Sequence, residues 1–260
     1  MKRFFRQCAA LVKLSILELW RRNDLFALFV LALVLLIPLS MSKPFGAAGA
    51  SRYMDEAALL LVWGYSLFLA LGTGSRLFPP EFESRTIYPL LAKPISRGTL
   101  LFGKYLGALA ATLSALALFY VLFAVASGLR GGAWFPPELL QAFVLHAMFV
   151  ALAVALALFG SLLVTPSANL TLSAMALLAM FFFGRRLPEF AHHVSGGLAA
   201  LANLAYAIGP HVEFFDMRQR VIHGWGGVDA ATMAAVLLYG ALYTAALLFL
   251  SALALRRKKL

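Results

Sequence analysis

Long stretches of this chain carry no charged side chain. Residues 25–41 form one such apolar run, and five more follow it along the chain. A helix needs about 20 residues to cross the bilayer core, and a backbone inside lipid must satisfy its own hydrogen bonds. Only 13% of the 260 residues are charged, against about 25% in a soluble domain. We predict an all-α integral membrane protein, with residues 1–260 forming a single transmembrane domain.

Six transmembrane helices are expected, over residues 25–41, 57–78, 105–127, 141–164, 168–184 and 230–255. Only a few residues separate the fourth and fifth runs, so these two helices should be antiparallel neighbours. Residues 196–208 are also apolar, but this stretch is short for a span and is typical of an interfacial or re-entrant helix. A seventh span there would move the C-terminus to the other side of the membrane.

The basic residues are distributed unevenly between the two sides of these six spans. Fifteen of the 22 Lys and Arg residues fall on the side that holds both termini and the segment after the second span, with only four of the 11 acidic residues. The positive-inside rule places that side in the cytoplasm. A seventh span would carry the C-terminal Arg-Arg-Lys-Lys outside and weaken this asymmetry, which favours six spans and two cytoplasmic termini.

Residues 1–24, before the first span, have an amphipathic pattern. Their apolar positions recur at intervals of three and four, which places them on one helix face: Phe4, Phe5, Cys8, Leu11, Val12, Ile16 and Leu19. We predict an N-terminal helix lying in the cytoplasmic interface. The alternative is that its basic residues only fix the topology. Cys8 is the only cysteine, so no disulfide framework exists.

The predicted spans contain few ionisable groups. Proton-coupled carriers usually need an acid or a histidine inside the bundle, and His146 is the main candidate here, with an interhelical polar contact favoured over a proton relay. Ser161 is too far along the same predicted helix to form a catalytic pair with His146. The sequence shows no metalloprotease motif and no phosphate-binding loop. We therefore expect a non-catalytic membrane subunit, and any nucleotide it uses must bind another chain.

Residues 187–228 form the longest outer loop. It is expected to fold into short helices that cap the outer mouth of the bundle. The loop also holds side chains of the kinds that bind copper or zinc: His192, His193, His211, Glu213, Asp216, Met217 and His223. Their spacing matches no known ligand set, so we predict no metal site.

Residues 79–104 concentrate the polar chemistry of the chain on the cytoplasmic side. Pro79 and Pro80 should stop or redirect the preceding helix, and Glu81 and Glu83 suit the first turn of a new one. Ser96 is a plausible N-cap for the next long helix. A plain juxtamembrane loop would explain the basic residues of this segment but not its acids and paired prolines. A short amphipathic helix that docks on another protein explains both.

This segment resembles the cytoplasmic loop of permeases of the type-two ABC exporter class. In that family the loop reads Glu-x-Glu, Gly-Thr, a Leu pair, Pro-(Ile/Val)-Ser-Arg and Gly-Lys in this order. The matching residues here are Glu81, Glu83, Thr86, Leu90, Leu91, Pro94, Ile95, Ser96, Arg97, Gly103 and Lys104. Arg85 departs from the pattern, because it stands where the family usually has a glycine. The six spans and the helical outer segment are also similar to the family architecture.

The resemblance implies that residues 81–97 form a coupling helix, which inserts into a groove on a separate cytoplasmic ATPase. The residues implied at that contact are Glu81, Glu83, Arg85, Thr86, Leu90, Leu91, Lys93, Pro94 and Arg97, with the leucines as apolar anchors and the charged residues around them. Two ATPase copies would pair with two permeases, either identical or related, in a bacterial cytoplasmic (inner) membrane. The permease itself would bind no cofactor, since ATP and Mg²⁺ belong to the ATPase, and no nucleic acid.

The expected function is the export of a lipidic or amphiphilic substrate, since the spans offer few charges to a small ion. A second hypothesis is a membrane scaffold that passes ATPase motion to an extracytoplasmic partner through residues 187–228 without moving cargo. A third, an intramembrane enzyme, has little support. The sequence leaves open the substrate and whether the permease pair is identical or mixed.

Overall fold

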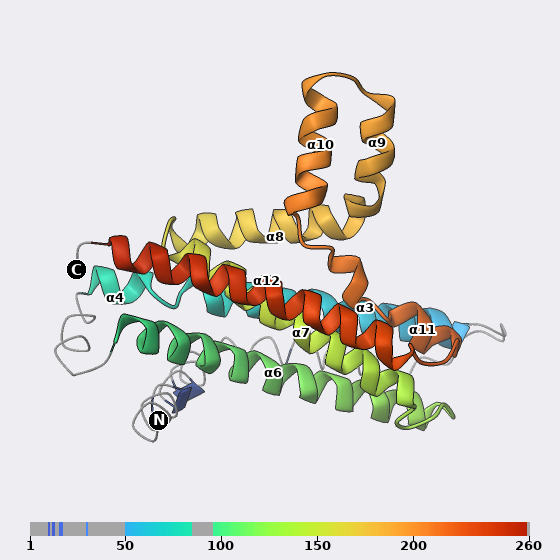
Figure 1. Cartoon of the computed structure of the whole chain (residues 1–260). Coiled ribbons are helices and arrows are strands. Elements are labelled where there is room, and N and C mark those ends of the chain that lie inside the picture. The colour runs from blue at the N-terminus through green and yellow to red at the C-terminus, as the bar shows by residue number, and fades with distance from the viewer. Residues whose placement is uncertain are drawn as a thin grey trace.

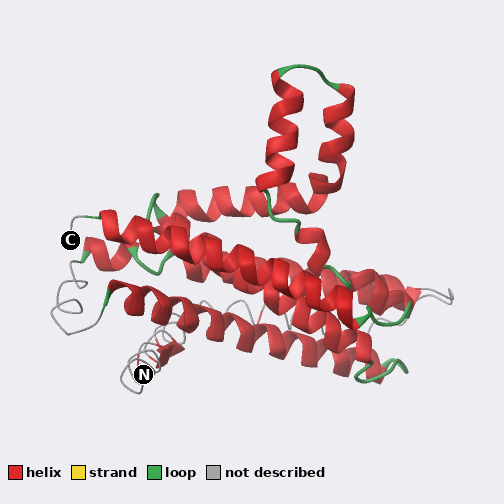
Figure 2. Cartoon of the chain, viewed as in Figure 1, coloured by secondary structure: helices red, strands yellow, loops and turns green. Residues whose placement is uncertain are grey.

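The computed structural model describes residues 50–84 and 96–258, together with the isolated positions 10, 12, 13, 16, 17 and 30. Within that part of the chain every regular element is a helix (Figure 2). The elements are α3 (Ala50–Ser75), α4 (Pro79–Glu83), α6 (Arg97–Leu129), α7 (Pro137–Ser161), α8 (Pro166–Phe183), η1 (Gly184–Arg186), α9 (Leu187–His193), α10 (Gly197–Ile208), η2 (Val212–Phe215), α11 (Arg218–His223) and α12 (Ala230–Arg257).

Five of the six predicted spans are confirmed as helices long and apolar enough to cross a membrane: the second to the sixth, which correspond to α3, α6, α7, α8 and α12. The first span, residues 25–41, lies outside the described residues, as does most of the interface helix predicted over residues 1–24. The total of six therefore stays a prediction. Residues 196–208 do form a short helix, α10, which folds back beside α9.

Local sequence explains where the long helices begin. The Ser96 side chain accepts a hydrogen bond from the backbone N–H of Thr99, which confirms the predicted N-cap of α6. Asp229 caps α12 in the same way, through the N–H of Thr232. Helices α7 and α8 begin instead with a proline in the first turn, where its missing N–H costs no intrahelical bond. These signals fix the start of each helix before any packing occurs.

Helix α7 is the centre of the bundle. It contacts α3, α6, α8 and α12, and 67% of its most apolar stretch is buried, against 11% for α12. A helix that is apolar all round and buried all round belongs in a core. The large apolar surfaces of α8 and α12 face outward instead, which suits contact with lipid.

One close contact between helices involves Gly74 on α3. A Cβ atom added at this position would lie 2.6 Å from Cβ of Ala157 on α7. Small residues at such positions let helix backbones approach closely, which is how helices associate inside lipid. A larger side chain at position 74 would push α3 and α7 apart.

The bundle has two distinct ends (Figure 1). We call one the α4 end: it holds α4, the start of α6 and the C-terminus of α12. The other, the α11 end, holds the start of α3, α11 and the start of α12. As predicted, η2 and α11 pack on the bundle, against α7 and α3. The pair of helices α9 and α10, which we call the hairpin, was also expected to cap the bundle, but it projects sideways across the direction of the long helices.

Candidate functional site

The polar segment singled out in the sequence begins with α4. Its first residues are Pro79 and Pro80, and three residues separate it from Ser75, the last residue of α3. Glu81 lies in the first turn of α4, whereas Glu83 is its last residue. The Phe78 side chain just before α4 is fully buried and stacks with Phe82, with 5.9 Å between the ring centroids. These two rings anchor α4 to the bundle.

Lys104 ties α4 to α6. Its side chain is buried, and the Nζ atom lies 2.6 Å from Oε1 of Glu81. The same Nζ donates to the backbone carbonyl of Leu77 at 2.6 Å and lies 5.1 Å from the centroid of the Phe78 ring. A charge this buried needs a partner of opposite sign, and Glu81 supplies it. None of the described residues donates a hydrogen bond to Oε2 of Glu81.

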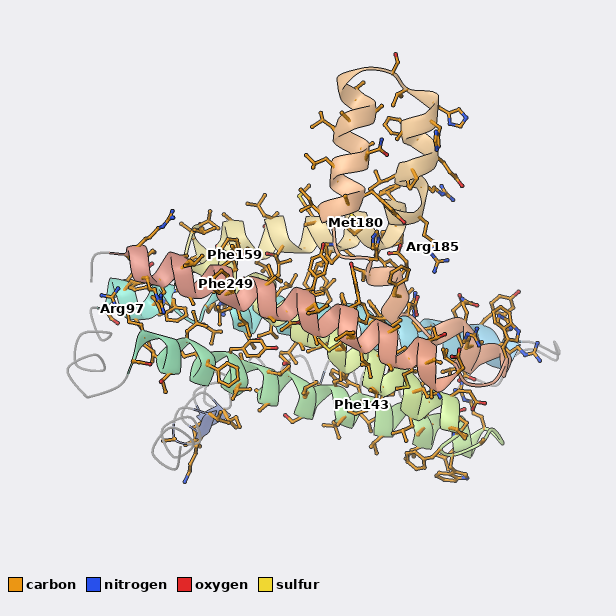
Figure 3. The ribbon with its side chains drawn as sticks, in the orientation of Figure 1. Arg97, Phe143, Phe159, Met180, Arg185 and Phe249 are labelled. Carbon is orange, nitrogen blue, oxygen red and sulfur yellow. The ribbon has the colours of Figure 1, made fainter. Side chains whose placement is uncertain are left out.

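Arg97 ties the start of α6 to the end of α12 (Figure 3). Its Nη1 atom donates to the backbone carbonyls of Leu255, Arg256 and Lys258 at 3.1, 3.3 and 3.2 Å. The last carbonyls of a helix have no intrahelical partner and carry partial negative charge, so a guanidinium there is stabilising. Lys258 in turn places its Nζ 4.5 Å from the centroid of the Phe82 ring on α4. The α4 end therefore joins α4, α6 and α12.

The structure describes only part of the predicted coupling residues. Glu81 and Arg97 make the intramolecular contacts given above, and Glu83 is exposed at the end of α4. The remaining predicted residues, Arg85, Thr86, Leu90, Leu91, Lys93 and Pro94, lie outside the described residues. Their contact with an ATPase stays a prediction. Sequence reasoning missed the pairing of Glu81 with Lys104 and the cap that Arg97 provides, because spacing along the chain does not show which distant residues meet.

A second polar group lies inside the bundle, in the half nearer the α11 end. His146 is fully buried and stacks on Trp63, with 4.6 Å between the ring centroids. Its Nε2 atom lies 2.6 Å from Oγ of Ser66, and its Nδ1 atom lies 3.1 Å from the Tyr120 hydroxyl. We call His146, Ser66 and Tyr120 the polar triangle. It joins α3, α6 and α7, which confirms that His146 makes an interhelical polar contact.

One neutral tautomer satisfies every hydrogen bond of the polar triangle. The Ser66 hydroxyl donates to the carbonyl of Trp63 at 2.9 Å, so its oxygen accepts from Nε2–H of His146. The unprotonated Nδ1 then accepts from the hydroxyl of Tyr120. A neutral, fully paired group carries no large desolvation cost inside the bundle. Ser161, considered above as a partner of His146, donates to the carbonyl of Leu158 instead.

The polar residues of 187–228 do not converge. Nowhere in the described part of the chain do three His, Cys, Asp or Glu side chains come together as metal ligands would. Arg218 pairs with Asp216, with Nη2 and Oδ2 2.8 Å apart. The Arg218 guanidinium also lies over the rings of Trp63 and Phe181, at 5.8 and 5.3 Å from their centroids. These contacts attach α11 to α3 and α8.

A bundle of long apolar helices, with charged residues at both of its ends and the neutral polar triangle inside, defines a membrane-embedded helical subunit. A family model described as ABC-2 family transporter protein matches residues 30–260. The chain belongs to this family, and it is therefore a permease-type membrane subunit of an ABC transporter. Families of this kind work in general with an ABC ATPase. A comparison with curated proteins finds no match.

Proposed function

We propose that this subunit couples ATP hydrolysis by a separate cytoplasmic ATPase to the export of a lipidic or amphiphilic substrate. The α4 end would face the cytoplasm, and residues 81–97 would receive the ATPase. The excess of basic residues at this end and the resemblance of the segment to permease coupling loops both support this orientation. Two permeases and two ATPases would form the transporter, in a bacterial inner membrane with both termini in the cytoplasm.

The observation that carries this proposal is the anchoring of the segment at both of its ends. Lys104 holds the first end through Glu81, and the carbonyls of the last turn of α12 hold the second end through Arg97. A force applied between residues 84 and 96 therefore reaches α6 and α12 directly. If the segment had no such anchors, movement of a docked ATPase would displace the loop without moving the helices. Glu81 and Arg97 would thus position the segment, while the exposed Glu83 would contact the ATPase.

An apolar cavity supports a lipidic or amphiphilic substrate. A pocket of about 160 Å³ opens between α3 and α8, and ten residues line it: Leu60, Trp63, Gly64, Leu67, Phe149, Leu177, Leu178, Phe181, Phe182 and Val212. A dry cavity of about 150 Å³ holds benzene in another protein, so this one has room for a ring or a short stretch of acyl chain. Nothing in its lining would replace the hydration shell of an ion.

The first test is charge reversal at Glu83 in the full chain, reconstituted in liposomes with its candidate ATPase. E83K should weaken ATPase binding by about 1 kcal/mol, roughly five-fold in Kd, because an exposed interfacial charge contributes about this much. The matched control is E189K, a reversal at an exposed acid of α9. Unchanged ATPase binding with E83K, or an equal loss of binding with E189K, would contradict the assignment of residues 81–97 as the coupling segment.

The alternative function, transmission of motion without cargo, is favoured by one observation: α12 is attached both at its C-terminal turn and near its middle. Arg97 holds its C-terminal turn, and nearer the α11 end the Tyr239 hydroxyl accepts from the N–H of His211 at 2.9 Å. Tyr243 donates to the carbonyl of Ile208, the last residue of the hairpin. Motion of α12 would therefore move the hairpin. ATP-dependent transfer of a fluorescent phospholipid across the liposome membrane separates the two functions, because only the exporter produces it.

A further inference from the structure

The apolar cavity between α3 and α8 has a cation at its edge. The guanidinium of Arg218 lies over the rings of Trp63 and Phe181, at 5.8 and 5.3 Å from their centroids, and both rings line the cavity. The Arg218 side chain is only 13% exposed, although enclosing a charge is costly. A purely apolar ligand would gain nothing from this charge. The cavity and Arg218 together form a site with an apolar part and a cationic part.

Hydrogen bonds within the protein use only part of this guanidinium. The Nε atom of Arg218 donates to Oδ1 of Asp216 at 2.9 Å, and its Nη2 atom donates to Oδ2 at 2.8 Å. Among the described residues, none accepts a hydrogen bond from its Nη1 atom. A guanidinium carries N–H donors on all three of its nitrogens and suits carboxylate and phosphate oxygens. Arg218 can therefore bind an anionic group of a ligand while Asp216 keeps the side chain in place.

The chain segments around this edge of the cavity are basic. Residues 184–186 follow α8, and residues 212–223 comprise η2, α11 and the link between them. These two segments carry four arginines and two acidic residues: Arg185, Arg186, Arg218, Arg220, Glu213 and Asp216. Asp216 is already paired with Arg218, and Glu213 is buried, whereas Arg185 and Arg186 are exposed. The net positive charge favours an anionic headgroup over a neutral or cationic one.

The position of the cavity along α8 suits a ligand that lies in a bilayer. The residues of α8 that line it fall within the last two turns of the helix, which ends at Phe183. The arginines of η1 follow directly (Figure 3), and arginines at the end of an apolar helix reach the headgroup level. Phe149 in the wall of the cavity is 1% exposed, whereas Leu60 and Phe182 at its rim are 50% and 63% exposed. In the described part of the chain, the cavity is therefore closed toward α7 and open along α3 and α8.

We propose that this site binds an anionic amphiphile with a single hydrocarbon chain, whose headgroup contacts Arg218 and whose chain enters the cavity. The cavity volume of about 160 Å³ accommodates part of one chain and leaves no room for a second. Arg218 determines the specificity, because an oxyanion gains a charge-assisted hydrogen bond that a hydroxyl headgroup does not. This inference rests on the proposed export of a lipidic or amphiphilic substrate, and it assigns that substrate a negative charge and one chain.

Fluorescence of Trp63 tests the site without any transport assay. The chain has four tryptophans, so the substitutions W20F, W134F and W225F leave Trp63 as the only one. The full chain is placed in phosphatidylcholine nanodiscs, and quenching is measured with undecyl phosphate, undecanol and undecyltrimethylammonium, each carrying a bromine at the end of its chain. Referred to the concentration of probe in the bilayer, half-maximal quenching should need about five-fold less of the phosphate than of the alcohol. The cationic probe should bind more weakly than either.

A matched pair of glycine variants tests whether the chain enters the cavity. Gly64 lines the cavity and Gly72 does not, although both belong to α3. A Cβ atom added at either position would meet nothing within 4 Å, so both helices should tolerate a side chain there. G64L should remove most of the quenching, because its side chain occupies the cavity. G72L should leave the quenching unchanged.

Two further variants test the charge with opposite expected signs. D216N keeps Arg218 but removes the acid that competes for it, so the preference for the phosphate over the alcohol should increase. The double variant R218M/D216N removes both charges of the ion pair, and this preference should disappear. A folding defect would weaken binding in both variants, so an increase in one and a loss in the other can only arise from the charge at position 218.

Three results would overturn the proposal. Equal quenching in G64L and G72L would exclude the cavity as the binding site. Equal half-maximal concentrations of the phosphate and the alcohol, or an unchanged preference in R218M/D216N, would exclude recognition of an anion by Arg218. The measurement needs neither ATP nor an ATPase. Quenching without lipid transfer in liposomes would therefore contradict only the proposed export, and lipid transfer without this quenching would contradict only the anionic site.

Discussion

Polar groups join three helices at the α4 end and also in the polar triangle, but the two regions use opposite kinds of groups. At the α4 end the contacts are charged: Lys104 meets Glu81, and Arg97 meets the C-terminus of α12. In the polar triangle, deeper in the bundle, every group is neutral and each hydrogen bond has a donor and an acceptor. Charged groups gain strong, directional contacts near water, but their desolvation becomes costly far from it. The comparison indicates that the charged end is suited to receive a partner and the neutral triangle to hold the bundle together.

The largest effect on stability should come from removing the charge of Lys104 at the α4 end. K104M leaves Glu81 without its counterion and the carbonyl of Leu77 without its donor, and we expect a loss of about 2–3 kcal/mol in the free energy of unfolding. Thermal unfolding in detergent measures this loss. The double variant K104M/E81Q should recover most of the stability, because the uncompensated charge is gone. If the double variant is no more stable than K104M, the ion pair is not what holds α4.

A somewhat smaller loss of stability is expected when His146 of the polar triangle is replaced. H146F keeps the ring that stacks on Trp63 but removes both hydrogen bonds, so the buried hydroxyl of Tyr120 loses its partner. The expected loss is about 2 kcal/mol, since an unpaired buried group costs about 1–3 kcal/mol. H146F/Y120F should regain about half of it. The control H192F changes an exposed histidine and should leave the unfolding temperature unchanged, whereas equal losses at both positions would contradict the polar triangle.

The cap that Arg97 provides at the C-terminus of α12 should contribute about 1 kcal/mol to the free energy of unfolding, because this helix end is partly open to solvent. R97A should therefore raise hydrogen exchange at the last turn of α12 while leaving the start of that helix protected. In contrast to the effect at His146, this one should shrink as salt is added, because salt screens charges near water. R186A, at an exposed arginine of η1, is the control. Unaltered exchange near residues 255–257 in R97A would disprove the cap.

The smallest effect concerns pH and the start of α12. The N–H of Thr232 bonds to the Asp229 carboxylate and lowers the pKa of that carboxyl below its usual value of 3.8. A lowered pKa in the folded state means that the carboxylate stabilises the helix start above about pH 4 and that this contribution is lost as pH falls further. Hydrogen exchange at residues 231–234, taken relative to the intrinsic rate of an unprotected amide at the same pH, should rise in that acid range. D229N, which keeps a capping oxygen, should show no such pH dependence, and a rise equal to that of the parent chain would exclude Asp229 as its cause.

Local patterns predicted much of the fold, since five apolar runs became long helices within four residues of the expected bounds, except that α3 begins seven residues and α6 eight residues earlier. The reason is that a bilayer allows few structures, and length and hydropathy then specify a helix. Ser96 as an N-cap was predictable in the same local way. The direction of the hairpin could not be predicted from the sequence, because no local pattern in residues 187–208 indicates how these residues are oriented relative to α8. The coupling residues were predicted by resemblance, and for all of them that prediction stands untested.

The sequence by itself determined that this chain is a helical membrane protein, that most of its basic residues fall on one side of the predicted spans, and that it resembles an ABC exporter permease. Only the tertiary structure decided which charges meet. Glu81 and Lys104 are 23 positions apart, and Arg97 reaches carbonyls more than 150 residues away. Ser66, Tyr120 and His146 likewise come from three separate helices. Helix formation depends on neighbours in the chain, but the pairing of buried polar groups depends on how those helices pack, and this is set by the whole bundle.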